Sequence, residues 1–357
     1  MSAILEFAPE TVRPPIAGRL RAPVKVAVVG ATGAVGSEMV ACLQRRGFPV
    51  ASLKLLASAR SRGRTLSFRS EAVPVTALGE AALEGQDLVL FAASAEVSRA
   101  YAPLAVAGGA VVIDNSSAFR MDPNTPLVVP EVNGEQALAH RGIIANPNCC
   151  AAVAVMALAP LQAISRIRRV IASTYQAASG AGAQAMAELR ESTEAYLHGR
   201  PYRSQVLAHA YAFNLFSHDS PVDPDTGCNE EETKVAQELR KLLGDADLRV
   251  GVTCVRVPVL RAHSMALTVE FEDPVEPEAA RRALAAAPGV RVVDDARANH
   301  FPMPSEASGR DEVLVGRIRR DASDPSGRSL ALFLAGDQLL KGAALNAVQI
   351  AETLLAG

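Results

Sequence analysis

A short polar stretch, Asn146-Pro147-Asn148-Cys149-Cys150, carries the residues best suited to covalent chemistry in this chain. It follows an apolar run at 142–145 and precedes a helix-forming run at 151–158. We expect Asn148 to cap that helix, which would put Cys149 in the first turn, where the helix dipole favours a nucleophilic thiolate. The same residues would also suit a small buried cysteine that begins a core helix, and this stretch alone does not separate the two.

The elements that would position such a nucleophile begin with a dinucleotide-binding pattern. A β-branched run at 24–29 ends at the glycine-rich turn GATGAVG (30–36), and a helix is predicted over 37–46. This order lets backbone N–H groups approach a pyrophosphate at the helix N-terminus. Glycine-rich turns also close ordinary strand–helix units, so the pattern by itself does not establish a cofactor.

The end of the second predicted strand, 53–57, favours NADP over NAD. NAD enzymes commonly place an acidic residue there to bind the ribose 2′-hydroxyl. This chain has Ser58, Arg60 and Ser61 instead. Hydroxyl and guanidinium groups suit a 2′-phosphate. A solvated basic loop is the alternative, but position and chemistry together favour phosphate binding.

The remaining pattern predicts two domains. Strands at 87–93 and 110–114, with a helix near 97–107, continue a parallel α/β sheet. Beyond Cys150 the chain predicts an α+β domain, with strands at 169–176, 248–258 and 264–272 and helices at 229–243 and 277–286. The polar segment 198–225 reads as irregular structure, which at this length is typical of functional segments. The apolar stripe of the last helix, roughly 338–355, predicts packing against the first domain.

Composition excludes several classes of function. The formal net charge of −2 gives no electrostatic footprint for nucleic acid or an anionic membrane. No apolar run approaches the ~20 residues that span a bilayer. The five cysteines include no CxxC pair, which argues against a disulfide framework or a structural zinc site, so no metal ligand is predicted. Residues 1–23 are predicted to be a flexible extension without a secretory signal, and the cytoplasm is the expected compartment.

With these features assembled, the chain resembles the aspartate-β-semialdehyde dehydrogenase family, in its plant-like and bacterial subgroup. The resemblance runs from about residue 24 to the C-terminus. It is carried by GATGAVG (30–36), ASARS (57–61), PNC (147–149), STYQAASGAG (173–182), NLFSHD (214–219), NEEETK (229–234), TCVRVPVLRAHS (253–264), VGRIRRD (315–321) and GDQLLKGAALNAVQIAE (336–352).

The resemblance implies a glyceraldehyde-phosphate-dehydrogenase-like architecture. Residues 24–148 and 336–357 would form an NADP-binding Rossmann domain, and 149–335 an inserted α+β domain for substrate and dimerisation. The implied reaction is NADPH-dependent reductive dephosphorylation of L-aspartyl-4-phosphate to L-aspartate 4-semialdehyde through a cysteine thioester. This step belongs to lysine, methionine and threonine biosynthesis. A homodimer or homotetramer is implied, with small-molecule substrates and neither nucleic acid nor membrane as partner.

The resemblance also assigns individual residues. Cys149 would be the nucleophile, Gln176 would orient the acyl-enzyme, and His263 would be the general acid and base. The implied substrate ligands are Arg120 and Lys234 for phosphate, Arg256 for the α-carboxylate, Glu231 for the ammonium group and Asn148 as a further donor. The implied cofactor ligands are Gly30, Thr32, Gly33, Ala34 and Val35 at the pyrophosphate, Ser58, Arg60 and Ser61 at the 2′-phosphate, and Ser179, Gly180 and Gln338 near the nicotinamide.

Two departures from the family pattern accompany these matches. Cys150-Ala151 stand where Ser-Thr is usual, and Cys150 is expected to be a helix residue that faces away from the site. Ser94-Ala95-Glu96 replace a small Gly/Ser loop and would bring a carboxylate toward the pyrophosphate. Two alternatives stay open. A related acyl-phosphate reductase would need different groups at Glu231, Lys234 and Arg256, and a non-catalytic paralogue would keep only the fold.

Overall fold

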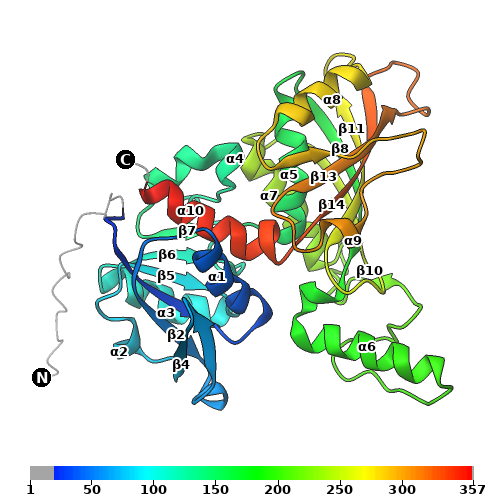
Figure 1. The fold of residues 1–357 in the computed structure, drawn as a ribbon. Coiled ribbons are helices and arrows are strands. Elements are labelled where there is room, and N and C mark those ends of the chain that lie inside the picture. The colour runs from blue at the N-terminus through cyan, green and yellow to red at the C-terminus, as the bar shows by residue number, and fades with distance from the viewer. Residues whose placement is uncertain (1–19, 356–357) are drawn as a thin grey trace, which may run out of the picture.

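The protein folds into two seven-stranded sheets that lie in separate lobes (Figure 1). This is a computed structural model in which residues 20–355 are described. Most of the predicted extension, residues 1–23, therefore lies outside the described residues. The predicted fold class, a Rossmann domain followed by an α+β domain, is confirmed. The exact domain boundaries predicted from the sequence stay a prediction.

The first sheet is parallel except at one edge, in the order β3-β4-β2-β1-β5-β6-β7. Its strands are β1 (Val24–Val29), β2 (Val50–Ala57), β3 (Thr65–Phe68), β4 (Glu71–Ala77), β5 (Leu88–Phe91), β6 (Val111–Asp114) and β7 (Ile143–Ala145). Its helical elements are α1 (Ala34–Arg45), η1 (Ala59–Ser61), α2 (Glu80–Leu83), α3 (Ala95–Ala107), α4 (Pro130–Asn133) and η2 (Gly134–Ala139). The central strands β5 and β6 are buried along their whole length, as expected of a parallel sheet covered on both faces.

The second sheet is mixed, in the order β12-β13-β14-β11-β8-β10-β9. Its strands are β8 (Ile167–Gln176), β9 (Phe216–Ser217), β10 (Arg249–Arg256), β11 (His263–Phe271), β12 (Val290–Val292), β13 (Val313–Arg320) and β14 (Ser329–Gly336). The helices of this half are α5 (Cys149–Gln162), α6 (Ala183–Leu197), α7 (Glu230–Leu243), α8 (Pro277–Ala286) and α9 (Pro304–Ala307), with the short η3 (Ala178–Ala181). A shared core joins α5, α7 and α8 to one face of this sheet.

The last described elements of the chain return to the first lobe. A π-helix, η4 (Leu340–Ala344), runs directly into α10 (Leu345–Leu355), whereas the sequence predicted one uniform helix over 338–355. Apolar residues of α10 such as Val348, Ile350 and Leu354 share a core with β1 and α1, which confirms the predicted packing on the first domain. Leu20 N–H donates to Leu354 O at 3.1 Å, so the two ends of the described chain lie side by side. None of the helices within 20–355 has the length and apolar character needed to span a membrane.

Candidate active site

A cavity of ≈ 290 Å³ opens at the N-terminus of α5, between the two lobes. Two of the three predicted catalytic residues, Cys149 and Gln176, line it. The other lining residues are Val35, Asn115, Arg120, Pro147, Asn148, Ser179, Gly180, His218, Glu231, Gln338, Leu339, Gly342 and Ala343. The cavity therefore gathers predicted catalytic, substrate and cofactor residues, but Lys234 is not among its lining residues.

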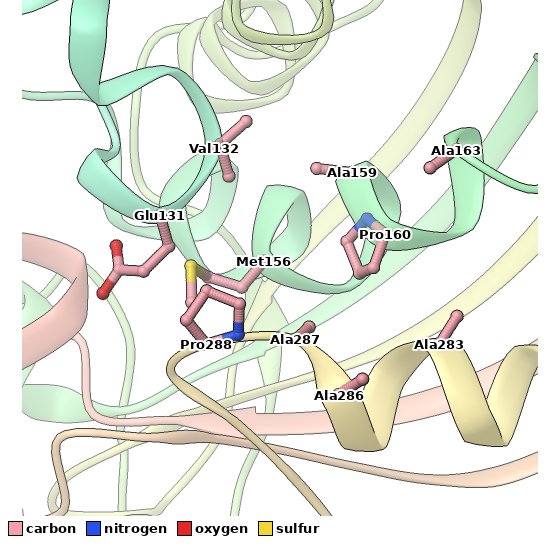
Figure 2. Close-up of a pocket in the computed structure, with 10 residues that line it drawn as sticks. All are labelled: Glu131, Val132, Met156, Ala159, Pro160, Ala163, Ala283, Ala286, Ala287 and Pro288. Carbon is pink, nitrogen blue, oxygen red and sulfur yellow. The ribbon is translucent and has the colours of Figure 1, made fainter.

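A larger hollow of ≈ 410 Å³ lies between α4, α5 and α8 and has a different character (Figure 2). Its walls are mainly apolar side chains such as Val132, Met156 and Pro288. At its edge, the carboxylate of Glu131 accepts hydrogen bonds from the buried Lys341 ammonium and from Gln349 Nε2. No predicted site residue lines this hollow, so the smaller, polar cavity is the candidate site.

Asn148 begins helix α5 as predicted and fixes the position of Cys149. Its Oδ1 accepts from the backbone N–H of Cys150 at 2.8 Å and of Ala151 at 3.3 Å, which satisfies two N–H groups of the first turn. Its Nδ2 donates to Glu231 Oε1 at 2.9 Å, and its backbone N–H donates to Glu238. Cys149 is thus the first residue of a helix whose start is anchored to α7.

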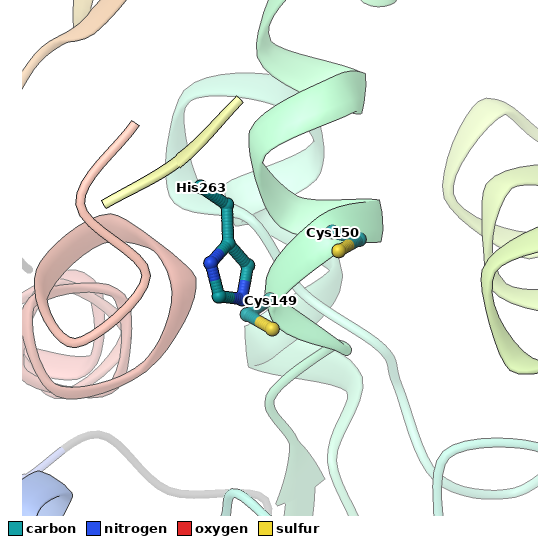
Figure 3. A group of neighbouring side chains, drawn as sticks. All are labelled: Cys149, Cys150 and His263. Atoms are coloured by element: carbon teal, nitrogen blue, oxygen red, sulfur yellow. The ribbon is translucent and has the colours of Figure 1, made fainter. Parts of the chain in front are cut away.

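The ring of His263 approaches Cys149 from β11 (Figure 3). The side chain is fully buried, and the backbone N–H of Ala177 donates to its Nδ1 at 3.0 Å. A neutral imidazole that accepts at Nδ1 carries its proton on Nε2. Among the described residues no hydrogen-bond partner reaches Nε2. His263 therefore presents an N–H donor to the space beside Cys149.

The expectation that Cys150 faces away from the site is wrong. Its Sγ, the Sγ of Cys149 and a ring nitrogen of His263 all lie within 4.8 Å of one another, a grouping with donor types that metal ions can use (Figure 3). Because Nε2 of His263 already bears the proton, it lacks the lone pair that a metal requires. Covalent chemistry fits this trio better than metal binding, and the absence of metal ligands stays a prediction.

The surroundings of Cys149 favour its thiolate. The neighbouring Cys150 thiol has the largest effect and, with His263, lowers the pKa of Cys149 well below its usual range, although burial and Glu231 oppose the shift. The same proximity and burial raise the pKa of Cys150. The pKa values of the two adjacent thiols are thus shifted in opposite directions. These shifts favour a thiolate at Cys149 and a protonated thiol at Cys150.

Glu231 supplies a buried negative charge at the cavity wall. Its Oε1 accepts from Asn148 Nδ2 at 2.9 Å and from Gln176 Nε2 at 3.1 Å. Burial alone would raise the pKa of Glu231, but His218, the two amide donors and Arg256 together lower it. The carboxylate is therefore ionised and can accept a bound cationic group.

Arg256 supplies a buried positive charge, and two residues that sequence reasoning did not single out hold it. Its Nε donates to Asp219 Oδ1 at 3.1 Å, and its Nη2 lies 2.9 Å from His218 Nε2. Within residues 20–355, no partner reaches its Nη1. A Cβ added at Gly180 would stand 3.1 Å from both this Nη1 and His263 Nε2, so the free donors of the two side chains converge there. The only sequence signal for His218 and Asp219 was the NLFSHD motif within the polar segment 198–225.

The two predicted phosphate ligands lie in different settings. Arg120 lines the cavity, but its Nη1 donates to the buried Glu238 at 3.1 Å, and its Nε and Nη2 donate to backbone carbonyls of Asn146 and Asn115. Burial raises the pKa of Glu238 against the opposing charge of Arg120. Lys234 lies on α7 three residues from Glu231, partly exposed, and its Nζ pairs with Glu230 at 3.0 Å. The cavity therefore contains Arg120 and leaves Lys234 outside.

The glycine-rich turn forms a cradle that fits a dinucleotide. Gly30 has φ +79°, and a Cβ there would meet Ala92 O at 2.1 Å, so only glycine is compatible. Gly33 precedes α1 without a side-chain cap, which leaves the first N–H groups of the helix available for phosphate oxygens. Thr32 Oγ1 lies 3.2 Å from Ser61 Oγ, which joins this turn to η1, the short helix that bears Arg60. Glu96 is exposed in the first turn of α3.

Gln338 joins the predicted nicotinamide end to the catalytic strand. Its Oε1 accepts from the backbone N–H of Ala262 at 3.0 Å, and its Nε2 donates to Ser179. Next to it, Asp337 accepts from Arg261 Nε at 2.6 Å, and Arg261 Nη1 donates to Glu38 on α1 at 2.6 Å. These bonds fix the residues around His263 relative to the dinucleotide-binding helix.

Comparison with known proteins places this architecture among semialdehyde dehydrogenases. The model of the semialdehyde dehydrogenase NAD binding domain matches residues 25–140, and that of the dimerisation domain matches residues 158–341. The chain is 52% identical to aspartate-semialdehyde dehydrogenase of Synechocystis sp., covering 93% of this chain and 98% of the relative. It is 43% identical to the Bacillus subtilis enzyme of the same name, covering 92% and 96%. A crystal structure of aspartate semialdehyde dehydrogenase II from Vibrio cholerae in complex with ASA superposes with a TM-score of 0.89, at 41% identity over 93% of this chain and 98% of that chain.

The Cys149–Cys150 arrangement predicts a measurable change in thiol reactivity. Because the Cys150 thiol lowers the pKa of Cys149, Cys150→Ala should raise that pKa. Alkylation of Cys149 by iodoacetamide, followed by peptide mass spectrometry, should then reach its plateau at higher pH. Cys150→Ser should show a smaller rise, because a hydroxyl still donates. Cys42→Ala, which removes a buried thiol on α1, is the matched control. Identical pH profiles for all four proteins would contradict the assignment.

Proposed function

The chain belongs to the aspartate-semialdehyde dehydrogenase family, and we propose on this basis that the cavity around Cys149 is its active site. The protein catalyses NADPH-dependent reductive dephosphorylation of L-aspartyl-4-phosphate to L-aspartate 4-semialdehyde, a step in lysine, methionine and threonine biosynthesis. One observation above all supports the assignment of the site. A thiol with a lowered pKa begins a helix beside an imidazole N–H, in a cavity that holds buried charges of both signs.

In the first half-reaction, Cys149 Sγ attacks the carbonyl carbon of the acyl phosphate. The new C–S bond forms as the C–O bond to phosphate breaks, and the phosphate leaves with the electron pair. No base is needed to form the thiolate, because its pKa is already low. Gln176, held by Glu231 and Thr174, lies beside Cys149 and orients the resulting thioester.

In the second half-reaction, NADPH, when bound, supplies a hydride to the thioester carbonyl carbon. The Nε2–H of His263 donates a hydrogen bond to the carbonyl oxygen as negative charge develops there. The C=O bond re-forms as the C–S bond breaks, which releases the aldehyde and restores the thiolate. A proton donor aimed at the position where charge develops lowers the barrier. The Nε2–H tautomer fits this hydrogen-bonding role, whereas complete transfer of its only ring proton would leave an imidazolate. Removal of a proton from the Cys149 thiol would need the opposite ring state, in which Ala177 N–H could no longer donate to Nδ1.

The charged groups of the cavity match the three charged ends of the substrate. The free Nη1 of Arg256 binds the α-carboxylate, and Glu231 accepts the α-ammonium. Arg120 has N–H groups beyond the three that it already uses, and these face the phosphate. Asn148 supports them through its remaining Nδ2 hydrogen. For Lys234 to bind phosphate, it would have to leave Glu230.

The cofactor is NADP, and its ligands are assigned from the cradle. Gly30, Thr32, Gly33, Ala34 and Val35 surround the pyrophosphate at the start of α1. Ser58, Arg60 and Ser61, at the end of β2, bind the 2′-phosphate. Ser179, Gly180 and Gln338 approach the nicotinamide. The reaction depends on a reduced thiol and on NADPH, both of which suit the cytoplasm as the working compartment.

The enzyme forms oligomers through its dimerisation domain, and we propose a homodimer built on the outer face of the second sheet. That face carries Ile171 of β8, which is 44% exposed, beside Ser173 and Thr253 in a shallow hollow. Tyr175 and Phe333 contact each other further along it, with ring centroids 6.1 Å apart. A mixed apolar and polar sheet face suits association with a second copy.

The main test is the reverse reaction with semialdehyde, phosphate and NADP, followed by NADPH absorbance. The wild-type protein should produce NADPH, and Cys149→Ala should lower kcat by roughly a thousandfold or more, because the covalent step is lost. Cys150→Ala should remain active at alkaline pH, where Cys149 is still a thiolate. Equal loss in both variants would mean that the nucleophile is misassigned. Activity only with another semialdehyde would favour a related acyl-phosphate reductase.

Arg60→Ala should selectively raise the KM for NADP by roughly tenfold, because a charge-assisted bond to the 2′-phosphate is lost. The KM for NAD should stay unchanged, so the ratio of the two constants reports the contact. Arg62→Ala, a neighbouring exposed arginine, is the control. An unaltered NADP to NAD preference in Arg60→Ala would contradict the assignment.

Ile171→Glu should convert the dimer to a monomer in sedimentation velocity, because a carboxylate at the centre of the interface would be desolvated without a partner. Ile164→Glu places the same charge at a residue that is 40% exposed after α5, away from this face. It should sediment as wild type. A dimer that persists in Ile171→Glu would place the interface elsewhere.

A further inference from the structure

The buried guanidinium of Arg256 is oriented by two neighbours rather than by its own strand. Asp219 accepts a hydrogen bond from Nε, and Nε2 of His218 lies 2.9 Å from Nη2. Two of the three guanidinium nitrogens are therefore engaged by neighbouring side chains. The two-residue strand β9 pairs with the end of β10, with Phe216 opposite Arg256. His218 N–H also donates to Cys254 O at 2.9 Å. Segment 216–219 is thereby fixed against the strand that bears Arg256.

The contact with Arg256 determines the tautomer of His218. A guanidinium only donates hydrogen bonds, so Nε2 of His218 must accept from Nη2. Nδ1 lies 3.1 Å from Ser220 Oγ and 3.2 Å from the backbone N of Ser220. With Nε2 as the acceptor for Arg256, the proton of the neutral ring is on Nδ1 and is donated to Ser220 Oγ, so the backbone N–H of Ser220 cannot donate to Nδ1 in this tautomer. The same Ser220 Oγ accepts from the backbone N–H of Glu231 at 3.2 Å. One imidazole thus connects the cationic wall of the cavity to the residue that forms its anionic wall.

We propose that His218 and Asp219 are positioning residues that aim the free Nη1 of Arg256 at the substrate carboxylate, and that protonation of His218 weakens this hold. The inference rests on the proposed role of Arg256 as the carboxylate ligand. It adds a source of substrate selectivity, because the acceptors on Asp219 and at Nε2 of His218 together fix the plane of the guanidinium. A guanidinium held in the correct orientation is ready to form bidentate hydrogen bonds with a carboxylate, whereas a mobile guanidinium must first be ordered.

The sign of the pH dependence follows from the groups that face His218. Arg256 on β10 opposes its protonation, whereas Glu231 on α7, Asp219 and Cys149 on α5 favour it. Burial has the largest effect, and with Arg256 it lowers the pKa of His218 below its usual value. The neutral ring therefore persists into mildly acidic solution. Below its pKa both nitrogens donate, the bond to Nη2 is lost, and the KM for semialdehyde should rise as the pH falls.

Two substitutions test separately the hydrogen bond of His218 to Arg256 and its hydrogen bond to Ser220. His218→Gln keeps an oxygen acceptor at the distance of Nε2 and loses the donor to Ser220. His218→Asn keeps a donor near Nδ1 and cannot reach Arg256. In the reverse assay His218→Asn should raise the KM for semialdehyde roughly tenfold, as expected for loss of a bond to a charged group. Its KM for phosphate should be unchanged, and His218→Gln should retain most of the wild-type affinity. Only the wild type should show the acid-side rise in KM.

Three results would each contradict the proposal. The first is an equal rise in the KM for semialdehyde in His218→Gln and His218→Asn. The others are a parallel rise in the KM for phosphate, and an acid-side rise in KM that is the same in wild type and His218→Gln. If His218→Asn does not fold, Asp219→Asn tests the other contact and should raise only the KM for semialdehyde. Calorimetric titration with semialdehyde provides a readout without turnover. If the variants bind semialdehyde with the predicted ranking of affinities but the wild type forms no NADPH, the positioning role is upheld and the proposed reaction is contradicted. If the wild type forms NADPH but the variants bind semialdehyde as tightly as it does, only the positioning role is contradicted.

Discussion

The hydrogen bonds of Asn148 are the constraint on which the rest of the site depends. Its side-chain oxygen accepts a hydrogen bond from the first turn of α5. Its side-chain nitrogen donates to Glu231, and its backbone N–H donates to Glu238. One residue therefore fixes the helix that bears the nucleophile relative to the helix that bears the carboxylates. A smaller side chain here would leave helix N–H groups and a buried carboxylate unpaired at once. Because the same amide serves both helices, the thiol and the charge opposite it are placed together.

Buried ion pairs extend this rigidity outward from Cys149. Arg120 pairs with Glu238 and Lys341 with Glu131, each with its charges largely removed from water. The desolvation of such pairs offsets much of their attraction, so their value lies in geometry more than in stability. Burial lowers the pKa of Lys341 to about 8 even though Glu131 opposes the shift. Since Lys341 belongs to the π-helix that follows Gln338, its pairing with Glu131 joins that turn to α4.

The sequence predicted features that depend on neighbours along the chain. The Asn148 cap, the glycine turn and the strand–helix alternation follow from local chemistry, and all were found. The direction of Cys150 was missed because adjacent helical residues are only about 100° apart around the axis, so the thiol next to Cys149 can still lie near it. His218, Asp219 and Glu238 were missed as site residues because their partners are brought together only by tertiary packing. The π-helix is only five residues long and runs directly into α10, which is too short for a different hydrophobic repeat to be read from the sequence.

The return of α10 to the first lobe has a consequence for how the protein is made. The last strand of the first sheet ends at Ala145, and α10 begins at Leu345. A ribosome adding roughly 5–20 residues per second needs about 10–40 s to make the chain between them. During that time the residues of β1 and α1 that later contact Ile350 and Leu354 have no partner. Nascent chains therefore expose an apolar surface that chaperones can recognise, and the first lobe can complete its core only after α10 has been synthesised.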